Sequence, residues 1–151
     1  MEIQAPEPQV ALPFAPVVRR IQLDDMGFIF STWLKHYKQH SAITKNISNS
    51  VYYAKQHRII ERILARSLTV VAHPPEQPAV ILGYAVLEMA RPNIIHWVYV
   101  KGPWRRFGIA KALLGGLDYT HCSFSHWTHD IDPFRNRWPQ AVYDPFLAAP
   151  L

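Results

Sequence analysis

The chain of 151 residues lacks several features that would define its class. It contains one cysteine, Cys122, so an internal disulfide is excluded and a reducing, cytoplasmic compartment is expected. No apolar run approaches the roughly 18 residues of a membrane span. The residues after Met1 form neither a basic region nor an apolar stretch, so we expect no secretory signal. Apolar residues make up 49% of the chain and charged residues only 18%, which excludes a disordered chain and favours one globular domain.

Acidic residues are also scarce. The chain has 11 Asp and Glu against 16 Lys and Arg, which gives a formal net charge of +5. The basic excess is concentrated between residues 35 and 66, where Glu61 is the only acid. The basic residues there are Lys35, Lys38, Lys45, Lys55, Arg58, Arg62 and Arg66. Such a surface favours anionic partners such as nucleic acid, phosphorylated cofactors or acidic proteins.

Residues 1–16 contain four prolines and no apolar period. Because proline fixes φ and removes an amide donor, we interpret this segment as an extended tail. It could equally be an arm that binds a neighbouring subunit. The remaining residues, 17–151, are predicted to form a single domain without internal repeats.

The hydrophobic pattern predicts a mixed α/β fold. The expected strands are 17–23, 68–72, 79–89, 94–100 and 119–127. The expected helices are one that begins at Asp24 or Asp25, then 51–66, 107–117 and a short one near 139–143. Strands 79–89 and 94–100 are predicted to pair as a hairpin. The order gives a mostly antiparallel sheet flanked by helices, with one β-α-β crossover.

The segment most informative about function lies where the last of these paired strands ends. It continues into a loop and a helix start with the pattern Arg105-x-x-Gly108-x-Ala110. The first amides of a helix have no partner inside the helix, and the macrodipole adds positive potential there. Gly108 and Ala110 leave room for an anion to approach the backbone, while Arg105 and Arg106 add charge. This arrangement suits a diphosphate.

The same segment resembles the signature of the GNAT superfamily of acyl-CoA-dependent acyltransferases, Gln/Arg-x-x-Gly-x-Gly/Ala between a strand and a helix. The resemblance implies a GNAT-like fold that uses acetyl-CoA to acylate an amine by direct attack. It implies that the main chain of Val98 and Val100 pairs with the pantetheine arm between two splayed strands. The diphosphate would be held by the loop, formed by Arg105, Arg106, Phe107, Gly108, Ile109 and Ala110.

For proton transfer the resemblance points to Tyr143, at a position where the family often has a tyrosine acid for the departing thiolate. Pro139 and Pro145 interrupt the helix that normally carries it, and a packed aromatic residue is the alternative. The family often has a carboxylate base on strand 94–100, and this sequence has none there. His96 is the candidate base on that strand, with a structural histidine as the alternative. We expect strict alternation to place it on one face with Val98 and Val100. Glu88 is a second candidate base.

Two further groups have a functional and an ordinary interpretation. The metal-ligand types His121, Cys122, His126, His129, Asp130 and Asp132 match no zinc signature, so we expect no metal site, although a strand would place Cys122 and His126 on one face. The basic stripe of Lys55, Arg58, Arg62 and Arg66 is either a solvated helix face or a nucleic-acid surface. A catalytically silent scaffold that binds nucleic acid or a protein is therefore the alternative function. In its size and basic, proline-rich character the chain also resembles small acyltransferase-like proteins of bacterial viruses.

Overall fold

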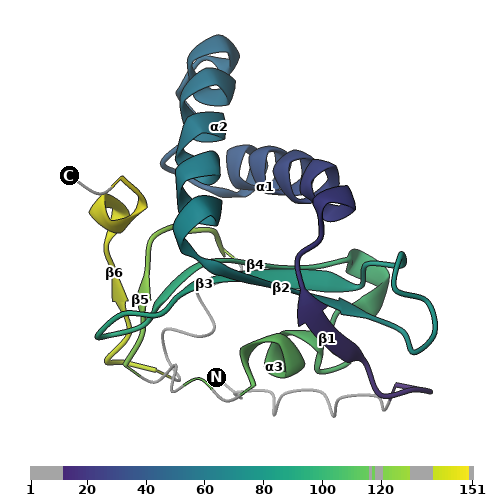
Figure 1. The fold of residues 1–151 in the computed structure, drawn as a ribbon. Coiled ribbons are helices and arrows are strands. Elements are labelled where there is room, and N and C mark those ends of the chain that lie inside the picture. The colour runs from purple at the N-terminus through teal and green to yellow at the C-terminus, as the bar shows by residue number, and fades with distance from the viewer. Residues whose placement is uncertain (1–11, 116, 118–120, 130–137, 150–151) are drawn as a thin grey trace, which may run out of the picture.

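The computed structural model describes residues 12–115, 117, 121–129 and 138–149. These residues form a six-stranded sheet with helices on both faces (Figure 1). The strands are β1 (Val17–Arg20), β2 (Leu68–His73), β3 (Gly83–Glu88), β4 (Ile94–Val100), β5 (Ser123–Phe124) and β6 (Val142–Tyr143). The helices are α1 (Met26–His40), α2 (Asn49–Arg66) and α3 (Ile109–Leu114), and a 3-10 helix, η4, follows β6 (Pro145–Ala148).

The strands lie in the sheet in chain order. Strands β1 to β4 pair antiparallel, and β3 and β4 form the predicted hairpin. The chain then crosses through α3 to β5, which lies parallel to β4. The predicted mixed sheet and its crossover are thus confirmed. A second parallel pair, β5 with β6, was not predicted.

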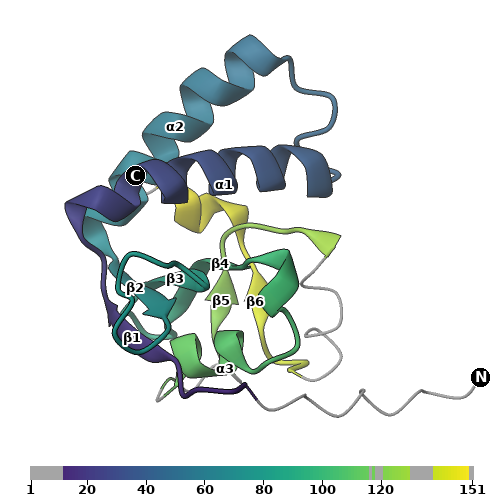
Figure 2. The same ribbon diagram turned by 90° about the vertical axis from the view of Figure 1, so that its right-hand side faces the viewer.

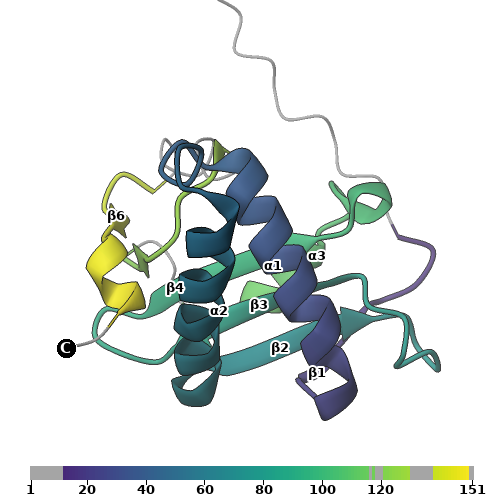
Figure 3. The ribbon, with the colours of Figure 1, turned by 90° about the horizontal axis from the view of Figure 1, so that it is seen from above.

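Helices α1 and α2 cover one face of the sheet and α3 covers the other, as Figure 2 shows. The α2 helix presents Tyr52, Ile60 and Ile63 to the core at helical spacing, and all three are buried. Trp33 of α1 stacks on Trp97 of β4, with ring centroids 5.4 Å apart and planes 7° from parallel. Seen from above, η4 lies beside α2 at the β6 end of the sheet (Figure 3). In the described part of the chain, no helix is long and apolar enough to cross a membrane.

The α3 helix packs closely on the sheet because Gly83 has no side chain. A Cβ atom there would lie 2.6 Å from the Tyr99 carbonyl oxygen and 3.3 Å from Cγ2 of Ile109. Gly83 pairs with Val100, the last residue of β4. Gly83 therefore sets the distance between the sheet and the start of α3.

Several predicted elements differ from the structure. Strand 17–23 ends at Arg20, and strand 79–89 begins only at Gly83. Strand 119–127 is reduced to β5, with residues 118–120 outside the described part. The short helix near 139–143 is wrong, because residues 142 and 143 form β6. Helix 107–117 begins only at Ile109, since Gly108 has a φ of 80° that cannot continue a right-handed helix.

The predicted tail is described only from residue 12 onward. Leu12 and Phe14 pack against the core beneath α3, and the Phe14 ring lies 5.9 Å from that of Trp104. This part of the segment therefore lies against the loop that precedes α3.

Candidate functional site

Strand β4 contains a bulge at His96. Leu87 of β3 pairs with Ile95, whereas the preceding Val86 pairs with Trp97, so His96 is an additional residue without a partner in β3. The bulge makes the expected alternation wrong. Val98 and Val100 pack on the α3 side of the sheet, whereas the His96 side chain joins a polar group with Glu88 and Ser125.

Beyond the bulge, β4 and β5 separate. Between the described residues of the two strands, ladder pairing is limited to Ile94 with Ser123 and Ile95 with Phe124, while β4 continues along β3 to Val100. The Lys101 amide donates to the Leu82 carbonyl of the β3 side at 2.9 Å. Because main-chain groups alternate along an antiparallel strand, those of Val98 and Val100 point away from β3. They lie on the stretch of the β4 edge beyond Ile95 that has no ladder pairing to the described residues of β5, which is called here the opening between β4 and β5. An extended ligand can form strand-like hydrogen bonds along such an edge.

The loop after β4 turns sharply toward α3. It contains a 3-10 turn over Gly102–Trp104, followed by two residues in the left-handed region, Arg106 at φ 69° and Gly108 at φ 80°. The Gly108 carbonyl accepts the first helical bond, from Ala112 at 3.0 Å. Alternating backbone handedness of this kind turns successive amides toward one point, which is a recurring geometry for binding anions. The exposed side chains of Arg105 and Arg106 add positive charge, so the loop fits a diphosphate.

The loop is anchored by contacts on both sides. The Trp104 ring lies 6.1 Å from that of Phe107, and both side chains pack on the core beneath α3. The guanidinium of Arg105 reaches back to the β4 end, where Nε donates to the Val100 carbonyl oxygen at 3.1 Å. The end of β4 and the start of α3 are therefore held together as one unit.

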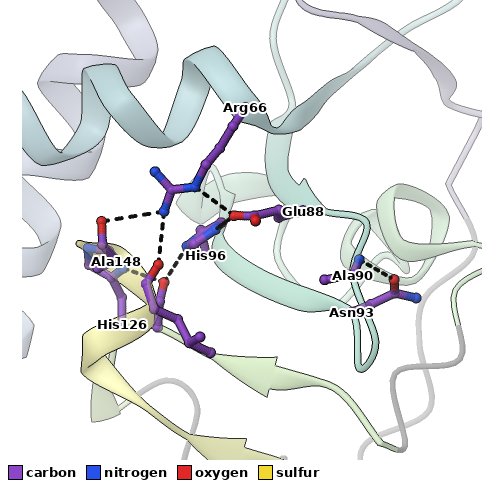
Figure 4. Close-up of polar contacts among 9 residues, drawn as sticks. Arg66, Glu88, Ala90, Asn93, His96, His126 and Ala148 are labelled. Carbon is purple, nitrogen blue, oxygen red and sulfur yellow. Dashed lines mark hydrogen bonds and ion pairs between the residues drawn. The ribbon is translucent and has the colours of Figure 1, made fainter. Parts of the chain in front are cut away.

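A chain of polar side chains, all buried except that of Glu88, crosses the point where β4 and β5 separate, and Figure 4 draws its part from His126 to Glu88. Nε2 of His96 lies 2.8 Å from Oε1 of Glu88, and Nδ1 of His96 lies 2.6 Å from Oγ of Ser125. The same Oγ lies 2.8 Å from Nδ1 of His126, whose Nε2 lies 2.8 Å from the amide nitrogen of Gln56. His96, the predicted base, thus has both ring nitrogens engaged within the protein.

Burial controls the protonation of this chain. Burial, with a smaller contribution from the neighbouring His96, lowers the pKa of His126 to about 3. Burial also lowers the pKa of His96, although the hydrogen bond that His96 donates to Glu88 opposes that shift. For Glu88, burial raises the pKa, but hydrogen bonds from His96 and Arg66 outweigh burial and leave the pKa below its usual value. At neutral pH this group of hydrogen-bonded side chains therefore contains two neutral histidines, His96 and His126, and one carboxylate, Glu88.

Tyr143, the predicted acid, lies on β6 rather than on a helix. Its hydroxyl is buried and has no hydrogen-bond partner among the residues that the structure describes. Its ring packs at right angles to that of Trp127, with centroids 5.3 Å apart. Burial raises its pKa, and the Asp144 carboxylate raises it further. A buried, unsatisfied hydroxyl that stays protonated is suited to donate a hydrogen bond to a ligand.

The cysteine and histidines near β5 do not converge on a metal. Cys122 is buried on the α3 side, whereas His126 contacts Trp33 of α1, because the strand is too short for alternation to extend from 122 to 126. Asp130 and Asp132 lie outside the described residues. Within the described ranges, no three side chains of His, Cys, Asp or Glu are grouped so that they could hold an ion.

The basic stripe on α2 is shorter than predicted. Lys55, Arg58 and Arg62 are exposed, but Arg66 turns inward. Its Nε donates to Glu88 at 2.8 Å and its Nη2 donates to the Leu147 carbonyl of η4 at 2.9 Å. Arg66 thus joins α2, β3 and η4, and does not belong to the exposed basic face.

Gln56 and Ser125 were not identified from the sequence. For Gln56 a signal existed, because the residue falls within the apolar stripe of α2, between Tyr52 and Ile60. A polar residue at a core position needs a hydrogen-bond partner. Nothing in the sequence around Ser125 distinguishes it from other serines.

Comparison with known proteins identifies the fold. No protein-family model and no curated protein matches the sequence. Among solved structures, a GCN5-related N-acetyltransferase from Ralstonia eutropha JMP134 matches with a TM-score of 0.53 and 15% identity, over 82% of this chain and 90% of the other. The chain has the fold of the GNAT superfamily of acetyltransferases, and the predicted resemblance is confirmed at the level of fold.

Two other matching structures are also named as acetyltransferases. An acetyltransferase from Trypanosoma brucei matches at 19% identity and a TM-score of 0.46, over 82% of this chain and 90% of the other. The PaiA N-acetyltransferase from Thermoplasma acidophilum, solved in complex with coenzyme A, matches at 17% identity and a TM-score of 0.45, over 67% and 68% of the two chains.

Proposed function

We propose that the protein is an N-acyltransferase that moves an acetyl group from acetyl-CoA to an amine. The observation that carries the proposal is the unit formed by the open edge of β4, the loop with left-handed residues at 106 and 108, and α3. The amides of residues 106–110 would hold the diphosphate, with Arg105 and Arg106 adding charge. The main chain of Val98 and Val100 would pair with the pantetheine arm. The GNAT fold supports this assignment.

In the proposed reaction the acceptor nitrogen attacks the thioester carbonyl carbon, a C–N bond forms and the C–S bond breaks. Tyr143 gives its phenolic proton to the departing thiolate, and the attacking amine loses one proton to a base. His96 can accept that proton only through its hydrogen-bonded partners, because it is buried with both nitrogens engaged. We place the reaction in the cytoplasm, in keeping with a chain that contains one cysteine.

Binding of acetyl-CoA is the first expected result. Isothermal titration should give a dissociation constant that rises at least about tenfold in Gly108→Glu, because the new residue strains a backbone at φ 80° and adds a negative charge to the anion site. The matched control is Gly27→Glu, which adds the same charge on α1 where a Cβ meets nothing within 4 Å. No binding by the unaltered protein at millimolar ligand would exclude the transferase.

Removal of the Tyr143 hydroxyl separates catalysis from binding. We expect Tyr143→Phe to lower kcat about tenfold in a mass-spectrometric assay with acetyl-CoA and a mixture of amines. The dissociation constant of acetyl-CoA should not change, because the hydroxyl is proposed to act on the thiolate. A kcat equal to that of the unaltered protein would exclude Tyr143 as the acid.

A silent scaffold is the second candidate, and the exposed Lys55, Arg58 and Arg62 on one face of α2 favour it. Those cations would contact phosphates of a nucleic acid, so binding would weaken with salt and would not depend on Tyr143. The unaltered protein and Tyr143→Phe therefore decide between the two candidate functions. Turnover that depends on Tyr143 supports the enzyme, whereas salt-sensitive nucleic-acid binding without turnover supports the scaffold.

A further inference from the structure

The polar chain from Gln56 to Glu88 has features that packing alone does not require. It joins four parts of the fold, namely α2, the residues just after β5, β4 and β3, through four contacts of 2.6–2.8 Å. All of its members are buried except Glu88, whose side chain is 23% exposed. It crosses between β4 and β5 just beyond Ile95 and Phe124, where the pairing of these strands ends. From there it leads to the partly exposed Glu88.

The chemistry of the five groups fixes the direction of every hydrogen bond. Ionised Glu88 can only accept, so His96 carries its hydrogen on Nε2. A neutral His96 then has a bare Nδ1, which accepts from the Ser125 hydroxyl. Because that hydroxyl has one hydrogen, Oγ of Ser125 accepts from Nδ1–H of His126.

His126 completes the series. Since it is neutral and has its hydrogen on Nδ1, its Nε2 is bare and accepts from the Gln56 amide. Every donor thus points toward Glu88, and hydrogen bonds aligned in this way polarise one another. The one basic atom at the start of the chain is Nε2 of His126, which is covered by an N–H donor. The N–H of an acceptor amine is a donor of the same kind and can replace it.

A serine between a histidine and a carboxylate-bound histidine also resembles a nucleophilic triad, but the contacts of its hydroxyl argue against that role. Oγ of Ser125 lies 2.6 Å from Nδ1 of His96 and 2.8 Å from Nδ1 of His126, so its hydrogen and its lone pair are both engaged and it does not face a thioester carbonyl. A proton can pass through a buried hydroxyl that accepts one hydrogen while it donates another. The geometry therefore favours proton transfer over a covalent acyl-serine.

We propose that His126, Ser125, His96 and Glu88 form a one-directional proton-transfer chain, with Gln56 occupying its entrance until an acceptor amine replaces it. The proposal rests on the proposed transferase function for the source of the proton. The amine loses its proton to Nε2 of His126. In the same step Nδ1 of His126 passes its proton to Ser125, Ser125 passes its own to Nδ1 of His96, and Nε2 of His96 passes its proton to Glu88. Charge is conserved, because the carboxylate becomes neutral as the cationic amine becomes neutral.

Side-chain nitrogen NMR on the protein at neutral pH tests the direction of the chain without any ligand. Two-bond proton–nitrogen correlations should give the Nδ1–H tautomer for His126 and the Nε2–H tautomer for His96. His126→Gln and His96→Gln variants assign the signals. The opposite tautomers, or a mixture of both in either ring, would overturn the proposal.

Ser125→Ala tests whether protons use the chain. We expect kcat for CoA release to fall about tenfold, with an unchanged dissociation constant for acetyl-CoA. The solvent isotope effect should also change from that of several moving protons to that of one. Ser67→Ala is the matched control, because the Ser67 hydroxyl is likewise buried but has no partner in the described structure. It should leave both quantities unchanged.

The outcomes distinguish the two proposals. Ser125→Ala with unchanged kcat and isotope effect overturns the proton-transfer chain while the transferase stands. A protein with the expected tautomers that binds no acetyl-CoA loses the transferase function and, with it, the source of the proton, which leaves the chain a structural role only. Expected tautomers together with a Ser125-dependent kcat support the chain.

Discussion

Replacement of Gly83 by alanine is expected to lower the free energy of unfolding by about 3 kcal/mol. The new methyl group would lie 2.6 Å from the Tyr99 carbonyl oxygen, which belongs to the backbone and cannot turn aside as a side chain would. Either β4 or α3 must therefore move. Because the proposed diphosphate loop joins those two elements, the affinity for acetyl-CoA should fall as well. Urea unfolding and calorimetric titration measure the two effects.

The control is Gly27→Ala, which inserts the same methyl group into α1. Nothing lies within 4 Å of a Cβ at that position, and alanine favours the helix over glycine by about 0.5–1 kcal/mol. We expect this variant to be slightly more stable than the unaltered protein and to bind acetyl-CoA equally well. Similar losses of stability in both variants would contradict the close approach of α3 to the sheet at Gly83.

The second large effect is a loss of stability in mild acid. Between pH 6.5 and 4.5, His126 alone should lower the free energy of unfolding by about 2 kcal/mol. Its pKa is about 3 in the folded protein, below the ordinary value of 6.5. As the pH falls through this window the unfolded chain binds a proton that the folded protein does not bind, so unfolding becomes more favourable. The lowered pKa of His96 acts in the same direction.

The slope of unfolding free energy against pH gives the measurement. His126→Gln should reduce the slope between pH 6.5 and 4.5 by up to one proton, whatever its effect on stability at neutral pH. Thr69→Val is the matched control, because it removes a buried hydroxyl without removing a titrating group. Its slope should equal that of the unaltered protein. Equal slopes in all three proteins would show that His126 titrates normally when folded.

The elements from β1 to β4 could be predicted from the local pattern of hydrophobic residues. The stripe of Ile60 and Ile63 in α2 and the runs of β-branched residues in β2 and β4 each have a period that indicates one element. The end of the chain has no such signal. Strands β5 and β6 contain two residues each, too few for any alternation, and the prolines at 139 and 145 suggested a broken helix in place of an edge strand.

The candidate site likewise has one part that could be predicted from the sequence and one part that could not. The loop from Arg105 to Ala110 was predictable because its residues are contiguous and their spacing carries the chemistry. The partners of His96 were not, because they depend on strand register. One unpaired residue turns His96 toward Glu88 and away from Val98, and local sequence gives no warning of it. The inward turn of Arg66 depends likewise on where η4 packs.

The bulge residue of β4, His96, also determines which of the main-chain groups after it face β3 and which face β5. Without it, the main-chain groups that now face the opening between β4 and β5 would belong to the neighbouring residues, and those of Val98 and Val100 would turn toward β3. The length of this strand is therefore more constrained than most of its side chains. Conservative exchanges along it leave the geometry of the opening intact, whereas the loss or gain of one position between Ile95 and Val98 inverts it.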